Sequence, residues 1–165
     1  MKKAEFHLND YVVNEDNKVC RVVGTRFEPC ASVEQPSQLV TIMWHEYDYK
    51  QGKSVSHVKE VPAIKVFGWS FTLDILNKIG FKKGEWLDTV VFRDPETHRS
   101  IVIDRTDGSL YAFSRGHFIM DLFYVDFVHD IQHVFETAGI EFPNLSGYCL
   151  VENAKRKHPV RLHAV

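Results

Sequence analysis

The chain has few of the residues that mark metal ribbons, disulfide scaffolds or membrane spans. Its 165 residues include only three cysteines, Cys20, Cys30 and Cys149. They are widely spaced and form no CxxC pair, so the sequence predicts neither a zinc ribbon nor a disulfide framework. No apolar run approaches the roughly 20 residues that cross a bilayer, and the first ten residues lack the apolar core of a secretory signal. We therefore expect reduced thiols and a cytoplasmic location.

The signatures of the common nucleotide-binding and hydrolytic enzymes are also missing. The sequence contains no P-loop, no GxGxxG and no GxSxG. No cysteine or serine lies in a recognisable nucleophile setting. We assign no catalytic residue and no cofactor, and we favour a non-catalytic protein while leaving enzyme activity open.

Charged residues make up an ordinary 25% of the chain but are unevenly placed. The net charge is −2; residues 151–165 hold four Lys and Arg against one Glu, a net +3, and the other 150 residues hold 16 basic against 21 acidic side chains, a net −5. The body would repel a phosphate backbone, whereas the basic tail could attract one. The tail supplies the candidate nucleic-acid contacts Lys155, Arg156, Lys157 and Arg161. A solvated tail or a strand that docks on a partner is the alternative.

Apolar material is sufficient for a folded core. Hydrophobic residues make up 44% of the chain and include 12 Phe, so disorder over most of the chain is not expected. The first part alternates between β-branched runs and turn residues. The predicted strands are 8–13, 18–23, 39–44 and 54–58, with turns at 14–17 and 49–53 and a loop at 28–37. Strands of this number and length predict a small SH3-like β-barrel over residues 1–66.

The second part mixes helices and strands. Thr72 as N-cap and Gly80 as stop predict a short helix over 73–79, packed through Leu73, Leu76 and Ile79. A three-stranded meander is expected over 86–92, 100–103 and 109–113, covered by a long helix over 124–138. The predicted fold class is α+β: a barrel over 1–66, a helix–meander–helix module over 67–143, and a basic tail over 144–165.

The long predicted helix carries a possible metal motif. Its apolar positions define one face, at 124, 127, 128, 131, 134, 135 and 138. His129 and His133 have the H-x-x-x-H spacing of zinc hydrolases, with Asp130 where those enzymes have Glu. Asp126 shares the polar face, on which we place both histidines. A solvated polar face is the competing interpretation.

Two further segments are candidates for ligand binding. Residues 44–49 form an aromatic and acidic strand end, in which Trp44, His45, Tyr47 and Tyr49 would make a wall for a flat ligand. Simple alternation of core and solvent positions competes with that interpretation. Arg115 and His117 flank Gly116 and could contact an anion; an ordinary glycine-containing loop is the alternative.

Three motifs resemble those of uncharacterised proteins from Bacteroidetes and their phages. Leu8-Asn-Asp-Tyr-Val12 is similar to an L-x-G-D-x-V start, with Asn9 at the glycine position. Residues 71–81 are similar to a P-I-P-L-T-x-E-I-L-x-K-N-G-F segment, although Gly68-Trp69-Ser70 stands where the prolines would be. Residues 128–135 are similar to a V-H-x-L-Q-x-L-Y helix. The resemblance implies a phage or mobile-element origin, hence the host cytoplasm, and no enzyme activity.

These features favour a small phage-type binding protein that acts by occupying a host protein or a small ligand. The first alternative is nucleic-acid binding through the basic tail. The second is a metal-dependent hydrolase that uses His129 and His133.

Overall fold

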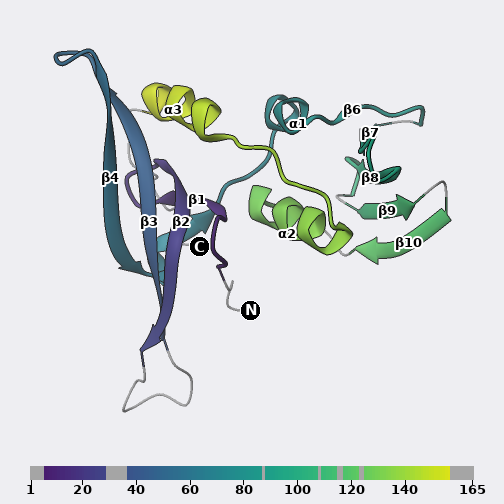
Figure 1. Ribbon diagram of the computed structural model, residues 1–165, viewed down its shortest axis with the longest axis horizontal. Helices are drawn as coiled ribbons and strands as arrows, with labels where there is room; N and C mark the ends of the chain where they lie inside the picture. Colours follow the sequence, from purple (N-terminus) through teal and green to yellow (C-terminus); the bar gives the residue numbers. More distant parts are fainter. Residues whose placement is uncertain are drawn as a thin grey trace. The chain divides into compact units, whose positions relative to one another are not determined.

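Two antiparallel sheets and three α-helices are found in the residues that the computed structural model describes (Figure 1). These residues are 6–28, 37–86, 88–107, 109–114, 117–122 and 125–156, with the backbone alone for Phe113 and residues 117–122. The chain divides into two units. Unit 1 combines Met1–Trp69 with Ser146–Val165, and unit 2 is Ser70–Leu145. The α+β prediction is confirmed.

Unit 1 contains a five-stranded antiparallel sheet that curls into a half-barrel (Figure 1). Its strands lie in the order β4-β3-β2-β1-β5. They are β1 (Tyr11–Asn14), β2 (Val19–Glu28), β3 (Ser37–Asp48), β4 (Lys53–Pro62) and β5 (Val66–Gly68), with a 3₁₀ turn at Ala63–Lys65 before β5. The four predicted strands are confirmed as elements, but β2, β3 and β4 are longer than expected, and β5 was not predicted. Strands β3 and β4 pair without interruption from Leu39↔Pro62 to Asp48↔Lys53.

Asn9 has φ 74° just before β1. This is the left-handed region that glycine and asparagine tolerate best. Its N–H donates to the Val22 carbonyl at 2.7 Å, which ties the chain start to β2. Asn9 is therefore a residue type suited to this turn.

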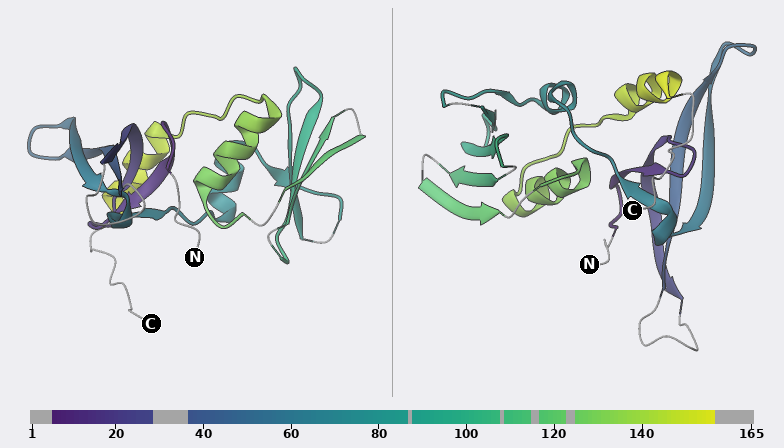
Figure 2. Two further views of the ribbon diagram at one scale, coloured as in Figure 1. Left: turned by 90° about the horizontal axis from the view of Figure 1, so that it is seen from below. Right: turned by 180° about the vertical axis from the view of Figure 1, so that it is seen from behind.

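Alternation along β1 and β2 gives the unit 1 sheet two buried faces. The concave face encloses a cluster that includes Val12, Val22, Val40 and Ile42. The other face carries Tyr11 and Val19, and helix α3 (Ser146–Lys155) packs there against β2 and β3 (Figure 2). Because apolar surface lies on both faces, the sheet needs α3 to exclude water from the second one.

Helix α3 lies where the sequence indicated only a basic tail. Asn153 is 2% exposed and bonds to the backbone of β2: its Oδ1 accepts from Val19 N–H at 2.7 Å, and its Nδ2 donates to the Val19 carbonyl at 2.9 Å. Lys18 Nζ donates to the carbonyls of Asn153 and Arg156 at the end of the helix. These bonds are long-range, and the helix has little apolar periodicity. The sequence signal for α3 was correspondingly weak.

Unit 2 is built on a meander, β7 to β10, extended at one edge by the two-residue strand β6. The sheet order is β10-β9-β8-β7-β6. The strands are β6 (Lys82–Lys83), β7 (Thr89–Arg93), β8 (Arg99–Asp104), β9 (Leu110–Ser114) and β10 (His117–Leu122). The three predicted strands correspond to β7, β8 and β9. Strands β6 and β10 were not predicted.

Helix α1 (Leu73–Ile79) has the predicted ends. Thr72 Oγ1 accepts from Ile75 N–H at 3.3 Å, and Gly80 ends the helix with φ 114°. Its packing differs in one residue: Leu73 is 45% exposed, whereas Ile75 is buried with Leu76 and Ile79. The prediction for Leu73 was therefore wrong, because the buried side of the helix begins at Ile75, two residues later.

Helix α2 (Val128–Ala138) covers the inner face of the meander. The centroid of its Phe135 ring lies 4.7 Å from the ring centroid of Phe92 on β7 and 6.2 Å from that of Phe81. The helix begins four residues later than predicted. Asp130 Oδ2 accepts the N–H groups of Asp126 and Phe127 at 3.1 and 2.9 Å, which holds the preceding residues outside the helix. Tyr124, the predicted first residue, lies outside the described residues.

Candidate functional site

The proposed aromatic wall is divided between the two faces of the β3–β4 ribbon. Trp44 turns to the side of Ile42 and stacks on His57, with ring centroids 5.1 Å apart. His45 faces the other way, and its Nδ1 lies 2.9 Å from Ser56 Oγ. Tyr47 contacts Tyr49 near the ribbon end, with centroids 5.0 Å apart. Strand alternation thus separates Trp44 from His45 and Tyr47, and no single wall is formed.

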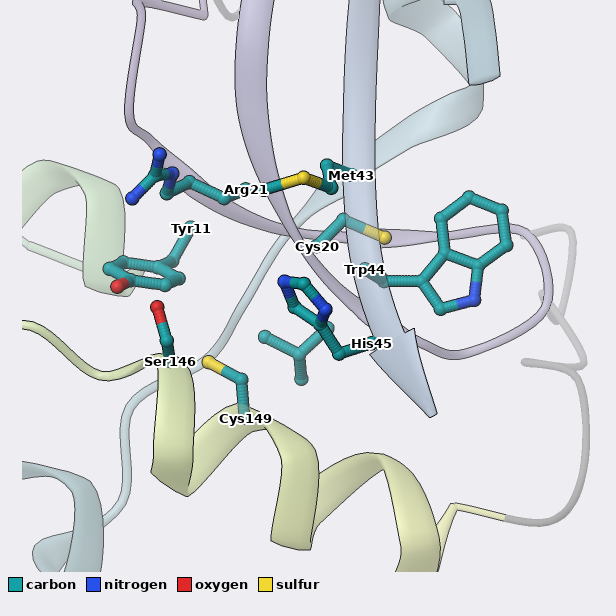
Figure 3. A pocket seen from close by; sticks show the side chains of 9 residues that line it. Tyr11, Cys20, Arg21, Met43, Trp44, His45, Ser146 and Cys149 are labelled. Carbon is teal, nitrogen blue, oxygen red and sulfur yellow. The ribbon is translucent and has the colours of Figure 1, made fainter. Parts of the chain in front are cut away.

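A small cavity lies between strands β1, β2 and β3 and helix α3 (Figure 3). Tyr11, His45 and Cys149 are among its lining residues, and its volume is about 20 Å³. That volume accommodates one water molecule and nothing larger. In Figure 3 the Trp44 indole extends away from Tyr11 and Ser146. The cavity therefore offers no ligand site to the aromatic residues of β3.

Two buried thiols, Cys20 and Cys149, line this cavity, and the flanking Lys18 and Glu46 form an ion pair. The ammonium of Lys18, 2.7 Å from Glu46 Oε1, holds the pKa of Glu46 below its usual range, and His57 adds a smaller effect. Burial raises the pKa of Cys20 to about 12 and that of Cys149 to about 12. Thiols with such pKa values are protonated at neutral pH and are poor nucleophiles.

The two histidines of the metal hypothesis lie in unequal surroundings. His129 is 5% exposed and stacks on Phe127, with centroids 5.5 Å apart and an interplanar angle of 7°. Our placement of His129 on the wet face was therefore wrong, because Phe127 covers the ring. His133 is half-buried, and Asp126 is exposed. No group of three or more His, Cys, Asp and Glu side chains placed to hold a metal occurs in the described part of the chain.

Asp130 has a structural task at the position where zinc hydrolases carry their general base. Its carboxylate accepts the two N–H groups before α2, and its Oδ1 lies 3.6 Å from His129 Nε2. A carboxylate engaged in capping is poorly placed to activate a water.

The basic tail and the glycine loop are only partly described. Lys155 pairs with Glu152 at 3.1 Å, and Arg156 donates to Asn17 Oδ1 at 2.8 Å. Both residues thus take part in contacts within unit 1. Lys157, Arg161 and Arg115 lie outside the described residues, as does the side chain of His117, whose backbone begins β10.

A larger hollow lies on the outer face of the unit 2 sheet, away from α2. It measures about 430 Å³, within the range of small-molecule sites. We call it the outer hollow; its lining residues are Glu85, Trp86, Thr89, Val91, Arg93, Val102, Asp104 and Tyr111. Strand register explains its floor, since Val91 pairs with Val102 and Val102 pairs with Tyr111. Side chains of directly paired residues lie on one face, so the three form an apolar row.

Trp86 borders this row and is 79% exposed. The turn that carries it is fixed: Gly84 N–H donates to the Thr89 carbonyl at 2.8 Å, and Thr89 Oγ1 donates to the Trp86 carbonyl at 3.0 Å. A Cβ at Gly84 would collide with the Thr89 hydroxyl, so glycine permits this close approach. A large aromatic side chain is thereby held at the edge of an apolar floor while remaining in solvent.

The charged groups at the rim of the outer hollow are two carboxylates, Glu85 and Asp104, and one guanidinium, Arg93. Glu85 and Arg93 form a loose, exposed pair with 3.9 Å between Oε1 and Nη2. Asp104 Oδ1 accepts from Thr106 N–H at 2.8 Å. No Lys or Arg among the described residues pairs with Asp104; the neighbouring Arg105 bonds to Asp88. The hollow therefore offers aromatic and aliphatic surface beside a carboxylate that lacks a counter-ion in the described structure.

Sequence reasoning missed the outer hollow. The sequence predicts a strand that begins at Trp86 and a meander that contains Val91, Val102 and Tyr111, but it indicates no hollow. Alternation along β7 and β8 gives apolar residues on both faces, and α2 covers only one. The sequence signal that could have revealed the hollow is the presence of apolar residues on both faces of the predicted meander.

None of the described helices has the length and apolar character needed to cross a membrane. No family model, curated protein or solved structure matches the chain.

Proposed function

We propose that the protein is a non-catalytic binding protein and that the outer hollow of unit 2 holds a side chain of a partner protein or a small ligand. The exposure of Trp86 beside the apolar row Val91–Val102–Tyr111 carries this proposal. Large aromatic residues are enriched in interfaces, where they fill the apolar centre of a contact. A polar rim around an apolar floor has the anatomy of such a site.

The rest of the chain supports binding more than catalysis. The described thiols are protonated at neutral pH, since burial raises the pKa of Cys20 and of Cys149 to about 12. Asp130 is occupied by capping, and the described residues contain no three-ligand metal cluster. The metal-dependent alternative would require ligands from elsewhere in the chain. Nucleic-acid binding would rest on Lys157 and Arg161, since Lys155 and Arg156 make internal contacts.

The resemblance to Bacteroidetes phage proteins supports a host protein as the partner and the host cytoplasm as the place of action. An SH3-like barrel belongs to the same proposal. What supports it is the curl of the five-stranded sheet and the strand order β4-β3-β2-β1-β5.

Amide NMR on the full chain tests this function with indole as the probe. We expect shift changes to concentrate at Val91, Val102 and Tyr111, and a Val102→Glu substitution to abolish them because it places a charge on the apolar floor. Val58→Glu is the matched control, since Val58 is 62% exposed on β4 of unit 1. Shift changes confined to unit 1, or unchanged by Val102→Glu, would contradict the proposal.

A further inference from the structure

We infer that the occupant of the outer hollow is a basic peptide segment of a partner protein, with an Arg or Lys side chain lying against Trp86 and its cation beside Asp104. The inference rests on the proposed function and names the chemistry of the partner. It is carried by the charge of unit 2 and by the arrangement of the hollow's lining.

Unit 2 is the acidic part of the chain. Residues 70–145 contain 7 Lys and Arg against 12 Asp and Glu, a net charge of −5, whereas the remaining residues contain 13 against 10, a net charge of +3. A field of this sign raises the local concentration of cationic partners and repels nucleic acid. Charge complementarity therefore selects a basic occupant for the unit 2 surface.

The lining of the hollow offers a suitable contact to both parts of a long basic side chain, its aliphatic stem and its cation. Val91 and Val102 offer apolar surface to an aliphatic stem. Trp86 presents an exposed indole, the aromatic ring that attracts cations most strongly. Asp104 lies one alternate position beyond Val102 on β8, opposite Thr89, at the end of the floor that Trp86 borders. A cation at this end meets both an aromatic face and a carboxylate.

The basic group that lines the hollow does not neutralise this end. Arg93 lies two alternate positions from Thr89 along β7, and Glu85 approaches it at 3.9 Å. Lys82 on β6 pairs with Val91 and so lies on the same face, one row away from the Asp104–Thr89 pair. Among the lining residues themselves, Glu85 and Asp104 outnumber Arg93 by one charge. A neutral apolar segment would bury the Asp104 carboxylate without a counter-ion, which is unfavourable; a basic segment removes that penalty.

Two capped pentapeptides test the inference with the full-length protein: Leu-Arg-Leu-Arg-Leu, and the same peptide with citrulline in place of arginine. Citrulline keeps the shape and removes the charge. We expect the arginine peptide to bind at the outer hollow at least about tenfold more tightly, a difference of about 1.4 kcal/mol. Its affinity should fall as salt is raised, because exposed charges are screened.

Asp104→Asn should remove most of the difference in affinity between the two peptides, because it removes the carboxylate charge. The turn should be kept, since asparagine retains an acceptor for Thr106 N–H. Asp107→Asn is the matched control: it removes the same charge from the same turn but does not line the hollow. Equal affinity of both peptides at the hollow would overturn the basic partner and leave the proposed function standing. Absence of shift changes at Val91, Val102 and Tyr111 with either peptide, together with no response to indole, would overturn both.

Discussion

Single polar residues decide how the elements of unit 1 are joined, and Asn153 is the clearest case. Its side chain bonds to Val19 N–H and to the carbonyls of Val19 and His45 from inside the α3 interface. Asn153→Ala would leave those backbone groups buried and unsatisfied. We expect a loss of roughly 1–3 kcal/mol in the free energy of unfolding, measured by urea denaturation. Val151→Ala on the same helix is the control, since Val151 is 52% exposed and should change stability little. Equal losses for both variants would contradict this role.

Glu46 supplies a pH-dependent contribution to the stability of unit 1. Lys18 lowers the pKa of Glu46 from its usual value of 4.5. A folded-state pKa below the unfolded one means that the ion pair stabilises the protein above about pH 4.5 and that this stabilisation is lost as the pH falls further. Glu46→Gln should therefore lower the melting temperature at pH 7, and its difference from the parent should shrink below pH 4.5.

Asp16→Asn provides the comparison for Glu46→Gln. Asp16 is an exposed carboxylate in the turn between β1 and β2, and its removal changes the net charge equally. A melting temperature that responds alike to both variants at every pH would show that net charge, and not the contact with Lys18, is responsible.

Residue types alone did not reveal these roles. The sequence singles out His129, Trp44 and His45 as unusual, yet each packs or bonds locally: His129 on Phe127, Trp44 on His57, and His45 with Ser56. Asp130 looked like a substitute for a catalytic glutamate and instead caps α2. The outer hollow arises from ordinary valines and a tyrosine whose placement depends on strand register, which no single residue encodes.

At the scale of elements, alanine substitutions of two glycines near helix ends should change stability in opposite directions. Gly139 follows α2 with φ 64°, and a Cβ there would lie 2.7 Å from Arg99 Nη1. Arg99 donates to the Ala138 carbonyl, so the added methyl group would disturb that bond as well. Gly139→Ala should cost about 1–2 kcal/mol in the free energy of unfolding. The measurement is urea denaturation followed by the near-ultraviolet signal.

Gly147 is the natural counterpart to Gly139. It lies within α3, and a Cβ there meets no atom within 4 Å. Gly147→Ala should stabilise the protein by about 0.5–1 kcal/mol, because alanine loses less backbone freedom on entering a helix. If both variants destabilise equally, the assignment of α3 as a regular helix over this residue is wrong.

Elements with strong local signals were predicted, and those that depend on distant partners were not. Thr72 and Gly80 define both ends of α1 through contacts within the helix itself. Helix α3 has no comparable signal, because its position depends on Asn153 and on Lys18, which is 135 residues away in sequence. Strand β10 pairs with β9 across a register shift between Phe118 and Met120, which obscures the alternation expected of a strand.

At the scale of the whole molecule, chain connectivity separates the two units. Unit 2 is one continuous segment, whereas unit 1 is made from two segments that flank it. The unit 2 core, with Phe81, Phe92 and Phe135, forms within that one segment. Residues 70–145 should therefore fold when produced alone, with a cooperative thermal transition and dispersed amide signals. They should also retain the outer hollow, so indole should perturb Val91, Val102 and Tyr111 as in the full chain.

Residues 1–69 alone should not form a stable fold, because they lack α3. Tyr11 and Trp69 would lose the cover of Tyr148 and Cys149, and Val19 would lose its bonds to Asn153. Joining residues 1–69 to 146–165 through a flexible Gly-Ser linker should restore a cooperative transition, since it returns the missing helix to the sheet. A cooperative transition for 1–69 without α3, or a disordered 70–145 segment, would show that the division into units does not describe how the chain folds.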